Sequence, residues 1–193
     1  MLFKDVIGQE TIKQQLVRTV AENRVSHALL FAGPEGCGKL PMALALAQYL
    51  NCTNRLPHDA CGQCPSCHKM AKLVHPDLHF VFPVVKTSSN SSPVSDTYIK
   101  EWREMVAQQN YFNLNQWFDF LGSEKQGMIY TNESGEIIRK LNLKTFEGQY
   151  KIMVIWHPEL MHDSAANKLL KMIEEPPAQT QFILVSDVPG EIL

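Results

Sequence analysis

The sequence predicts an α/β fold in which a parallel sheet is covered by helices on both faces. Short apolar runs, rich in β-branched and aromatic residues, alternate along the chain with segments whose apolar residues recur at helical spacing. This alternation is typical of parallel strands joined by crossover helices. At 193 residues and 45% hydrophobic content, the chain can bury a full core as one domain.

Four runs are predicted to be strands because they are too short for helices. They are HALLFA (27–32), DLHFVFPV (77–84), KIMVIW (151–156) and QFILVSD (181–187). The second run contains Pro83, which cannot donate a hydrogen bond to a neighbouring strand, so we expect that strand to stop there.

Helical patterns alternate with these strands, at 10–22, 39–50 and 164–175. The segment 39–50 is apolar on nearly every side, so we expect it to be deeply buried. The pair Pro176-Pro177 ends the last helix, because proline cannot continue it.

Residues 85–130 are interpreted as an insertion on the sheet. The insertion opens with a polar, serine-rich stretch at 86–95, which we expect to form a loop. Two amphipathic helical patterns follow, YIKEWREMVAQQ and NLNQWFDFLG. The pattern does not indicate where the insertion packs.

The composition argues against several classes of protein. The net charge is −2 and the pI is about 6.4, without the clustered Lys and Arg typical of proteins that bind a nucleic-acid backbone directly. No apolar signal segment opens the sequence and no apolar run has membrane-spanning length. We therefore expect a cytoplasmic protein with no membrane partner, in which five cysteines favour metal binding or reactivity over disulfides.

The stretch GPEGCGK at 33–39 has the spacing of a phosphate-binding loop, and it follows a predicted strand and opens a predicted helix. In such a loop Gly33, Gly36 and Gly38 let backbone N–H groups point at phosphate oxygens. The helix N-terminus adds partial positive charge, and Lys39 would reach the terminal phosphates. The alternative is a glycine-rich turn that binds no ligand.

Three positions of this expected site lack the oxygen atoms that ATP hydrolysis requires. Leu40 stands where a Ser or Thr hydroxyl would hold Mg²⁺. Trp156 and His157 stand where a strand end would carry one carboxylate for Mg²⁺ and one to polarise water. Glu159 as a displaced base is the alternative. We expect no catalytic residue and no ATP hydrolysis, with nucleotide bound weakly or not at all, because phosphates without Mg²⁺ lose charge neutralisation.

Four cysteines have the spacing of a metal site, namely Cys52, Cys61, Cys64 and Cys67. Four thiolates suit tetrahedral Zn²⁺ in a closed structural site. Free thiols, disulfides and an iron–sulfur cluster are the alternatives. We expect His58 and His68 to be surplus to the site and to face solvent, and Cys37 lies apart, inside the glycine loop.

These motifs together resemble one family. The segments FKDVIGQETIKQQL, SHALLFAGPEGCGK, LNC…CGQCPSC and NKLLKMIEEPPAQTQFILVSD closely resemble the bacterial clamp-loader subunits of DNA polymerase III, which are AAA+ proteins. The resemblance covers residues 1–84 and about 136–193, and it implies an AAA+ P-loop fold with a small zinc-binding insert at 51–70. The insertion at 85–130 departs from the family pattern.

Within this family, gamma/tau subunits keep the hydroxyl and the Asp-Glu pair, whereas these residues decay in the delta-prime group. Leu40, Trp156 and His157 therefore favour delta-prime. The resemblance implies a component of the DNA polymerase III holoenzyme that does not itself hydrolyse ATP. Its implied partners are gamma/tau and delta and, through the assembled complex, the sliding clamp and primed DNA. An active gamma/tau-like motor and an unrelated P-loop phosphotransferase are the alternatives.

The resemblance also implies how the chain is divided. Residues 1–193 match one AAA+ domain that lacks a last strand, a helical lid and a collar domain. We therefore expect an N-terminal fragment of a longer protein.

Overall fold

The computed structural model describes residues 1–88 and 90–192. The four predicted strands are confirmed and form one parallel sheet in the order β1-β4-β3-β2. They are β1 (Ala28–Ala32), β2 (Leu78–Val81), β3 (Lys151–Trp156) and β4 (Thr180–Ser186). β2 stops two residues before Pro83, and Val84 then makes a single antiparallel bridge with Met128.

Seven α-helices accompany the sheet in the described residues: α1 (Glu10–Ala21), α2 (Lys39–Leu50), α3 (Pro65–Ala71), α4 (Ile99–Gln108), α5 (Leu114–Phe120), α6 (Glu133–Leu141) and α7 (Asp163–Glu174). The three helices predicted at 10–22, 39–50 and 164–175 are α1, α2 and α7, and the two helical patterns of the insertion are α4 and α5. α3 and α6 were not predicted. The predicted loop at 86–95 includes Ser89, which lies outside the described residues; its other residues up to Val94 form no helix or strand.

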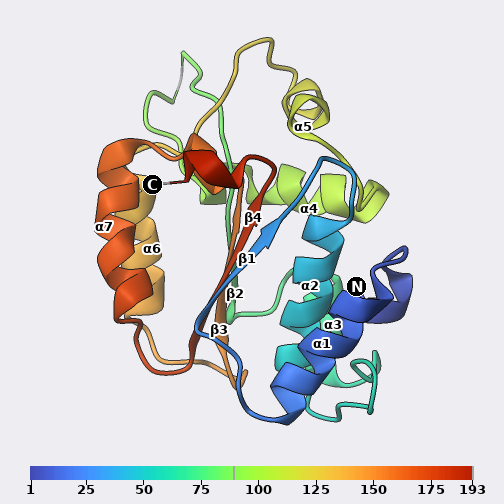
Figure 1. The fold of residues 1–193 in the computed structure, drawn as a ribbon. Helices are drawn as coiled ribbons and strands as arrows, with labels where there is room; N and C mark the ends of the chain where they lie inside the picture. Colours follow the sequence, from blue (N-terminus) through green and yellow to red (C-terminus); the bar gives the residue numbers. More distant parts are fainter. Residues whose placement is uncertain (89, 193) are drawn as a thin grey trace.

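Helices cover both faces of the sheet, so the predicted fold class is confirmed. α1, α2 and α3 lie on one face, and α6 and α7 lie on the other (Figure 1). Every residue of α2 is buried, as its apolar pattern predicts. Among the described residues, no helix combines the length and the apolar character needed to cross a membrane.

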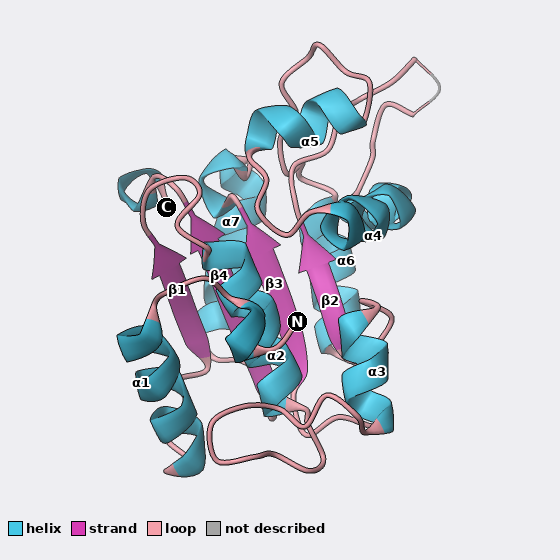
Figure 2. Cartoon of the chain, turned by 90° about the vertical axis from the view of Figure 1, so that its right-hand side faces the viewer, coloured by secondary structure: helices cyan, strands magenta, loops and turns pink. Residues whose placement is uncertain are grey.

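The insertion packs across the carboxyl ends of the strands, with α5 beyond the arrow tips (Figure 2). Its anchor is Trp102 of α4, which is fully buried and stacks on Phe82 at 4.3 Å between ring centroids. Trp117 of α5 meets Trp102 edge-on at 5.4 Å and donates a hydrogen bond to the Pro83 carbonyl at 2.8 Å. The insertion is therefore a packed part of the domain core.

A buried carboxylate joins the insertion to α6. Glu133 Oε2 accepts hydrogen bonds from the Ser95 backbone N–H at 2.6 Å and from the Ser95 hydroxyl at 3.0 Å. Its other oxygen, Oε1, has no hydrogen-bond partner among the described residues. Burial raises the pKa of Glu133 to about 7, against the hydrogen bonds from Ser95 and the charge of Lys140, which lower it.

We expect Glu133→Gln to flatten the pH dependence of stability. Because the folded pKa lies above the unfolded value of 4.5, this group's contribution is complete below pH 4.5 and is lost as the pH rises through 7. At pH 8 the glutamine variant should be more stable than the wild type by about 3 kcal/mol, and at pH 4 the two should be similar. Urea unfolding at both pH values tests this, and parallel pH profiles would contradict it.

Candidate phosphate loop and cysteine cluster

The loop at 33–38 leaves the end of β1 and enters α2, in the predicted strand–loop–helix context. Gly38 is the N-cap of α2 and has φ +88°, a left-handed conformation that glycine adopts without strain. Gly36 also has a left-handed φ, of +77°. The local backbone therefore has the form that the motif predicts.

The Lys39 ammonium is held by groups of its own chain. It lies 2.8 Å from Asp187 Oδ1 just after β4, and it donates to the carbonyl oxygens of Gly33 at 2.8 Å and Pro34 at 2.6 Å. Its side chain is only 8% exposed. Since an ammonium has three donors, these three oxygens use its full capacity.

The two apolar replacements lie in the hydrophobic core beside the loop. Leu40 and Trp156 are both buried. The Trp156 ring lies 5.2 Å from the Phe112 ring and 5.2 Å from the Trp102 ring, centroid to centroid. A hydrocarbon and an indole in these positions offer no oxygen ligand to a divalent cation.

At the end of β3 a histidine–glutamate pair replaces the expected acidic pair. His157 is buried and left-handed, with φ +54°, and its Nδ1 lies 2.9 Å from Glu159 Oε1. The same oxygen accepts the Asp187 backbone N–H at 3.2 Å. Burial raises the pKa of Glu159, but hydrogen bonds from His157, from the Glu159 backbone and from Ser186, with the charge of His157, together outweigh burial and lower the pKa to about 2. Glu159 is thus a buried structural carboxylate, poorly placed to act as a base.

Little space remains inside the loop. A cavity of about 30 Å³ lies between Gly36, Lys39, Tyr111 and Trp156, about enough for one or two water molecules. The arrangement therefore does not fit a magnesium-bound nucleotide. That Gly33, Gly36, Gly38 and Lys39 bind phosphate remains a prediction.

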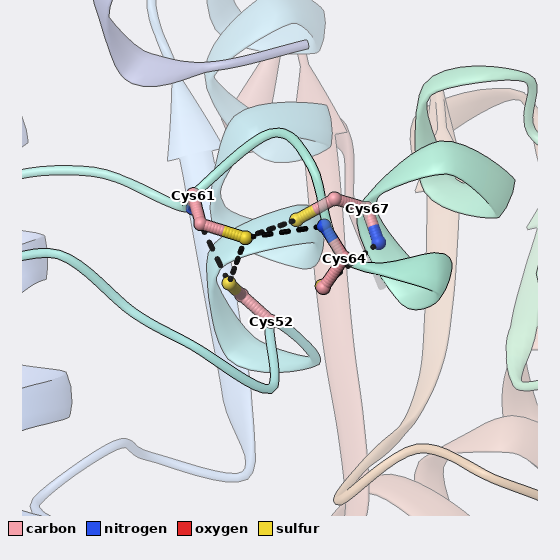
Figure 3. A group of neighbouring side chains, drawn as sticks. All are labelled: Cys52, Cys61, Cys64 and Cys67. Carbon is pink, nitrogen blue, oxygen red and sulfur yellow. Dashed lines mark hydrogen bonds between the residues drawn. The ribbon is translucent and has the colours of Figure 1, made fainter.

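The four predicted cysteine ligands converge on one point. Their sulfur atoms all lie within 4.8 Å of one another, with Cys52 and Cys61 3.6 Å apart and Cys61 and Cys67 3.9 Å apart. The sulfurs of these three cysteines point toward one another in Figure 3. A tetrahedral Zn²⁺ with bonds of about 2.3 Å would separate its sulfurs by roughly 3.8 Å. No disulfide is present among them. The geometry of the cluster therefore fits a metal ion bound by four cysteine thiolates.

Hydrogen bonds lower the pKa of two of these four thiols, Cys61 and Cys64. Cys61 Sγ accepts from the Gln63 and Cys64 backbones, which lowers its pKa. Burial opposes ionisation of Cys64, but hydrogen bonds from Thr53 and Cys67 outweigh it and lower its pKa to about 6. Metals bind the thiolate form, so these hydrogen bonds favour ligation.

Local structure explains why the cluster assembles. Cys52 lies two residues after the end of α2, and Cys64 is the N-cap of α3, with Pro65 in the first helical position where no N–H is needed. The Ser66 hydroxyl donates to the Asn51 carbonyl at 2.7 Å, which ties the two halves together. His58 and His68 are exposed, as predicted.

Two residues of the loop site were not predicted. Asp187 follows the run QFILVSD, and parallel strands end at one edge of a sheet, so its approach to Lys39 could have been inferred from the sequence. Tyr111, which covers Gly38, comes from the insertion, whose packing no local pattern indicates.

The chain is similar to subunits of DNA polymerase III. It is 24% identical to DNA polymerase III subunit tau/gamma of Haemophilus influenzae over 98% of this chain and 22% of that protein. It is 28% identical to DNA polymerase III subunit delta' of Bacillus subtilis over 96% of this chain and 44% of that protein. The chain thus spans less than half the length of these relatives.

A solved structure and a family model agree with these relatives. A DNA polymerase III gamma subunit-related protein of Thermotoga maritima matches with a TM-score of 0.51 at 15% identity, over 96% of this chain and 42% of that one, which supports the fold. The family model described as DNA polymerase III, delta subunit, matches residues 8–193. The predicted family resemblance is confirmed, and the chain belongs to this DNA polymerase III subunit family.

Proposed function

We propose that the chain is a non-hydrolysing subunit of the bacterial DNA polymerase III clamp loader, similar to delta-prime. Its partners would be the gamma/tau and delta subunits and, through the assembled complex, the sliding clamp and primed DNA. Family membership supports the clamp-loader role, and relatives of both the delta' and the tau/gamma kind match the chain. The choice between these kinds depends on the loop site.

One observation supports the assignment as a subunit that does not hydrolyse ATP. The positions that would hold Mg²⁺ and polarise water are filled by a leucine and a tryptophan of the core and by a histidine paired to Glu159. Hydrolysis of ATP depends on a metal ion to neutralise charge on the phosphates and on a group that orients the attacking water. An active motor would need Glu159 as base, but its side chain is only 4% exposed and its Oε1 already contacts His157 and accepts the Asp187 backbone N–H.

We also propose that the cysteine cluster holds one structural Zn²⁺ through Cys52, Cys61, Cys64 and Cys67. The donor set of four thiolates supports zinc, which forms closed tetrahedral sites of this kind. The ion would stabilise residues 51–70 against α2 and leaves no position for a reacting water.

A turnover assay tests the main proposal. Phosphate release from ATP and Mg²⁺ should stay at background for the full-length protein alone, and Lys39→Ala should not change it. With its partner subunits, turnover should be unaffected by Lys39→Ala in this chain. Steady hydrolysis by the protein alone that Lys39→Ala abolishes would favour the active motor instead.

A further inference from the structure

The segment 110–113, between α4 and α5, lies directly on the glycine loop. The Tyr111 ring faces Gly38: a Cβ placed on that glycine would meet Tyr111 Cε1 at 3.3 Å and its hydroxyl oxygen at 3.4 Å. Asn113 Nδ2 donates to Glu35 Oε1 of the loop at 2.7 Å. The segment is therefore in contact with the loop at both its middle and its end.

Tyr111 also joins the loop to the N-terminal segment. Its hydroxyl oxygen accepts the Ile7 backbone N–H at 2.8 Å. The neighbouring Phe112 ring packs on Trp156 at 5.2 Å, so the aromatic core fixes the segment from behind. Three parts of the chain far apart in sequence thus meet at one tyrosine.

Charge within the loop is already compensated. Asp187 supplies a carboxylate oxygen at 2.8 Å from the Lys39 ammonium, in a position where a bound anion would need that ammonium free. An entering phosphate would have to displace both the Tyr111 ring and the Asp187 carboxylate. The cavity of about 30 Å³ that remains has no room for a polyphosphate.

We propose that residues 110–113 form an internal cap, with Tyr111 as the blocking residue, that excludes polyphosphate ligands from the glycine loop. The cap deepens the proposed function and rests on it, since it concerns the same loop. The cap acts by a different route, however. Leu40 and Trp156 remove oxygen ligands for the metal ion, whereas the cap occupies the position of the phosphates themselves. The loop beneath it keeps Lys39, the left-handed glycines and the N-terminus of a twelve-residue helix, which together suit a di- or triphosphate once the ring is gone and the phosphate displaces the Asp187 carboxylate.

Binding of inorganic pyrophosphate and of ADP, each without added Mg²⁺, tests the cap by calorimetry on the full-length protein. We expect Tyr111→Ala to bind both ligands at least about tenfold more tightly than the wild type. In the wild type only the fraction of molecules with an open loop can bind, and the apparent affinity is reduced in proportion to that fraction. Tyr111→Phe, which keeps the ring and loses the hydroxyl, is the matched control and should bind like the wild type. Adding Lys39→Ala to Tyr111→Ala should abolish the gain, and adding Asp187→Asn should increase it.

Several results would overturn the cap. These are a folded Tyr111→Ala protein with wild-type affinity, an equal gain in Tyr111→Phe, or a wild type that already binds pyrophosphate as tightly as the alanine variant. Where circular dichroism shows that Tyr111→Ala is unfolded, Tyr111→Leu takes its place under the same criteria. Turnover remains a separate readout, because tighter binding without hydrolysis supports both proposals, and hydrolysis by the wild type would overturn only the proposed function.

Discussion

Replacing Cys67 with serine is expected to abolish stoichiometric zinc binding and to lower the melting temperature by roughly 10 °C. Cys67 is fully buried, so its sulfur cannot be replaced by water or by a neighbouring ligand. Structural zinc contributes about 10–16 kcal/mol of apparent binding energy in isolated zinc-finger peptides. A loss of only about 4 kcal/mol would shift the melting temperature by roughly 8–16 °C in a chain of this size.

Elemental analysis and thermal unfolding together check this expectation. The wild type should contain about one zinc per chain, and chelation should reproduce the loss of stability seen in Cys67→Ser. Cys37→Ser is the matched control, because Cys37 is a free cysteine outside the cluster, and this variant should keep its zinc. Freshly purified wild type with little zinc, or a Cys67→Ser protein that melts like the wild type, would contradict the assignment.

Replacing Trp102 with alanine is expected to lower the free energy of unfolding by about 3–5 kcal/mol. The ring is fully buried and packs against Phe82, Trp117 and Trp156, so its removal leaves a large cavity between the sheet and the insertion. The surrounding rings come from separate elements and cannot all move into the space.

Urea unfolding measures the effect, with Trp102→Phe as the control. Trp102 Nε1 has no hydrogen-bond partner among the described residues, so phenylalanine keeps a ring and removes an unsatisfied donor. We expect that variant to lose less than half of what alanine loses. A loss of under about 1 kcal/mol in Trp102→Ala would show that the insertion is loosely attached.

The sequence predicts the core of the fold well because its signals there are local. The shortness and the β-branched and aromatic residues of runs such as 151–156 and 181–187 favour buried strands, and the length of the uniformly apolar segment 39–50 favours a buried helix. The cysteine spacing is likewise local, and the four sulfurs meet as predicted. α6 was missed although ESGEIIRKL carries acidic residues in its first turn and basic ones in its last.

The closure of the loop could not be predicted, because it depends on contacts between distant segments. No pattern in QQNYFNLNQWF indicates that Tyr111 lies on Gly38 or accepts a hydrogen bond from the Ile7 N–H. From the sequence, Leu40 and Trp156 indicate only that oxygen ligands are missing, whereas their burial is seen only in the folded chain. The predicted loss of function and the observed loss of space therefore have different origins.

The strand order has a consequence for how the protein is made. β1 pairs with β4 and with no other strand among the described residues, and Ala28 faces Phe182 across the sheet. During synthesis from the amino end, ALLFA must therefore wait unpaired until residues 180–186 have left the ribosome. Pairing between strands far apart in the sequence slows folding. We therefore expect chaperones that bind exposed apolar segments to assist the nascent chain.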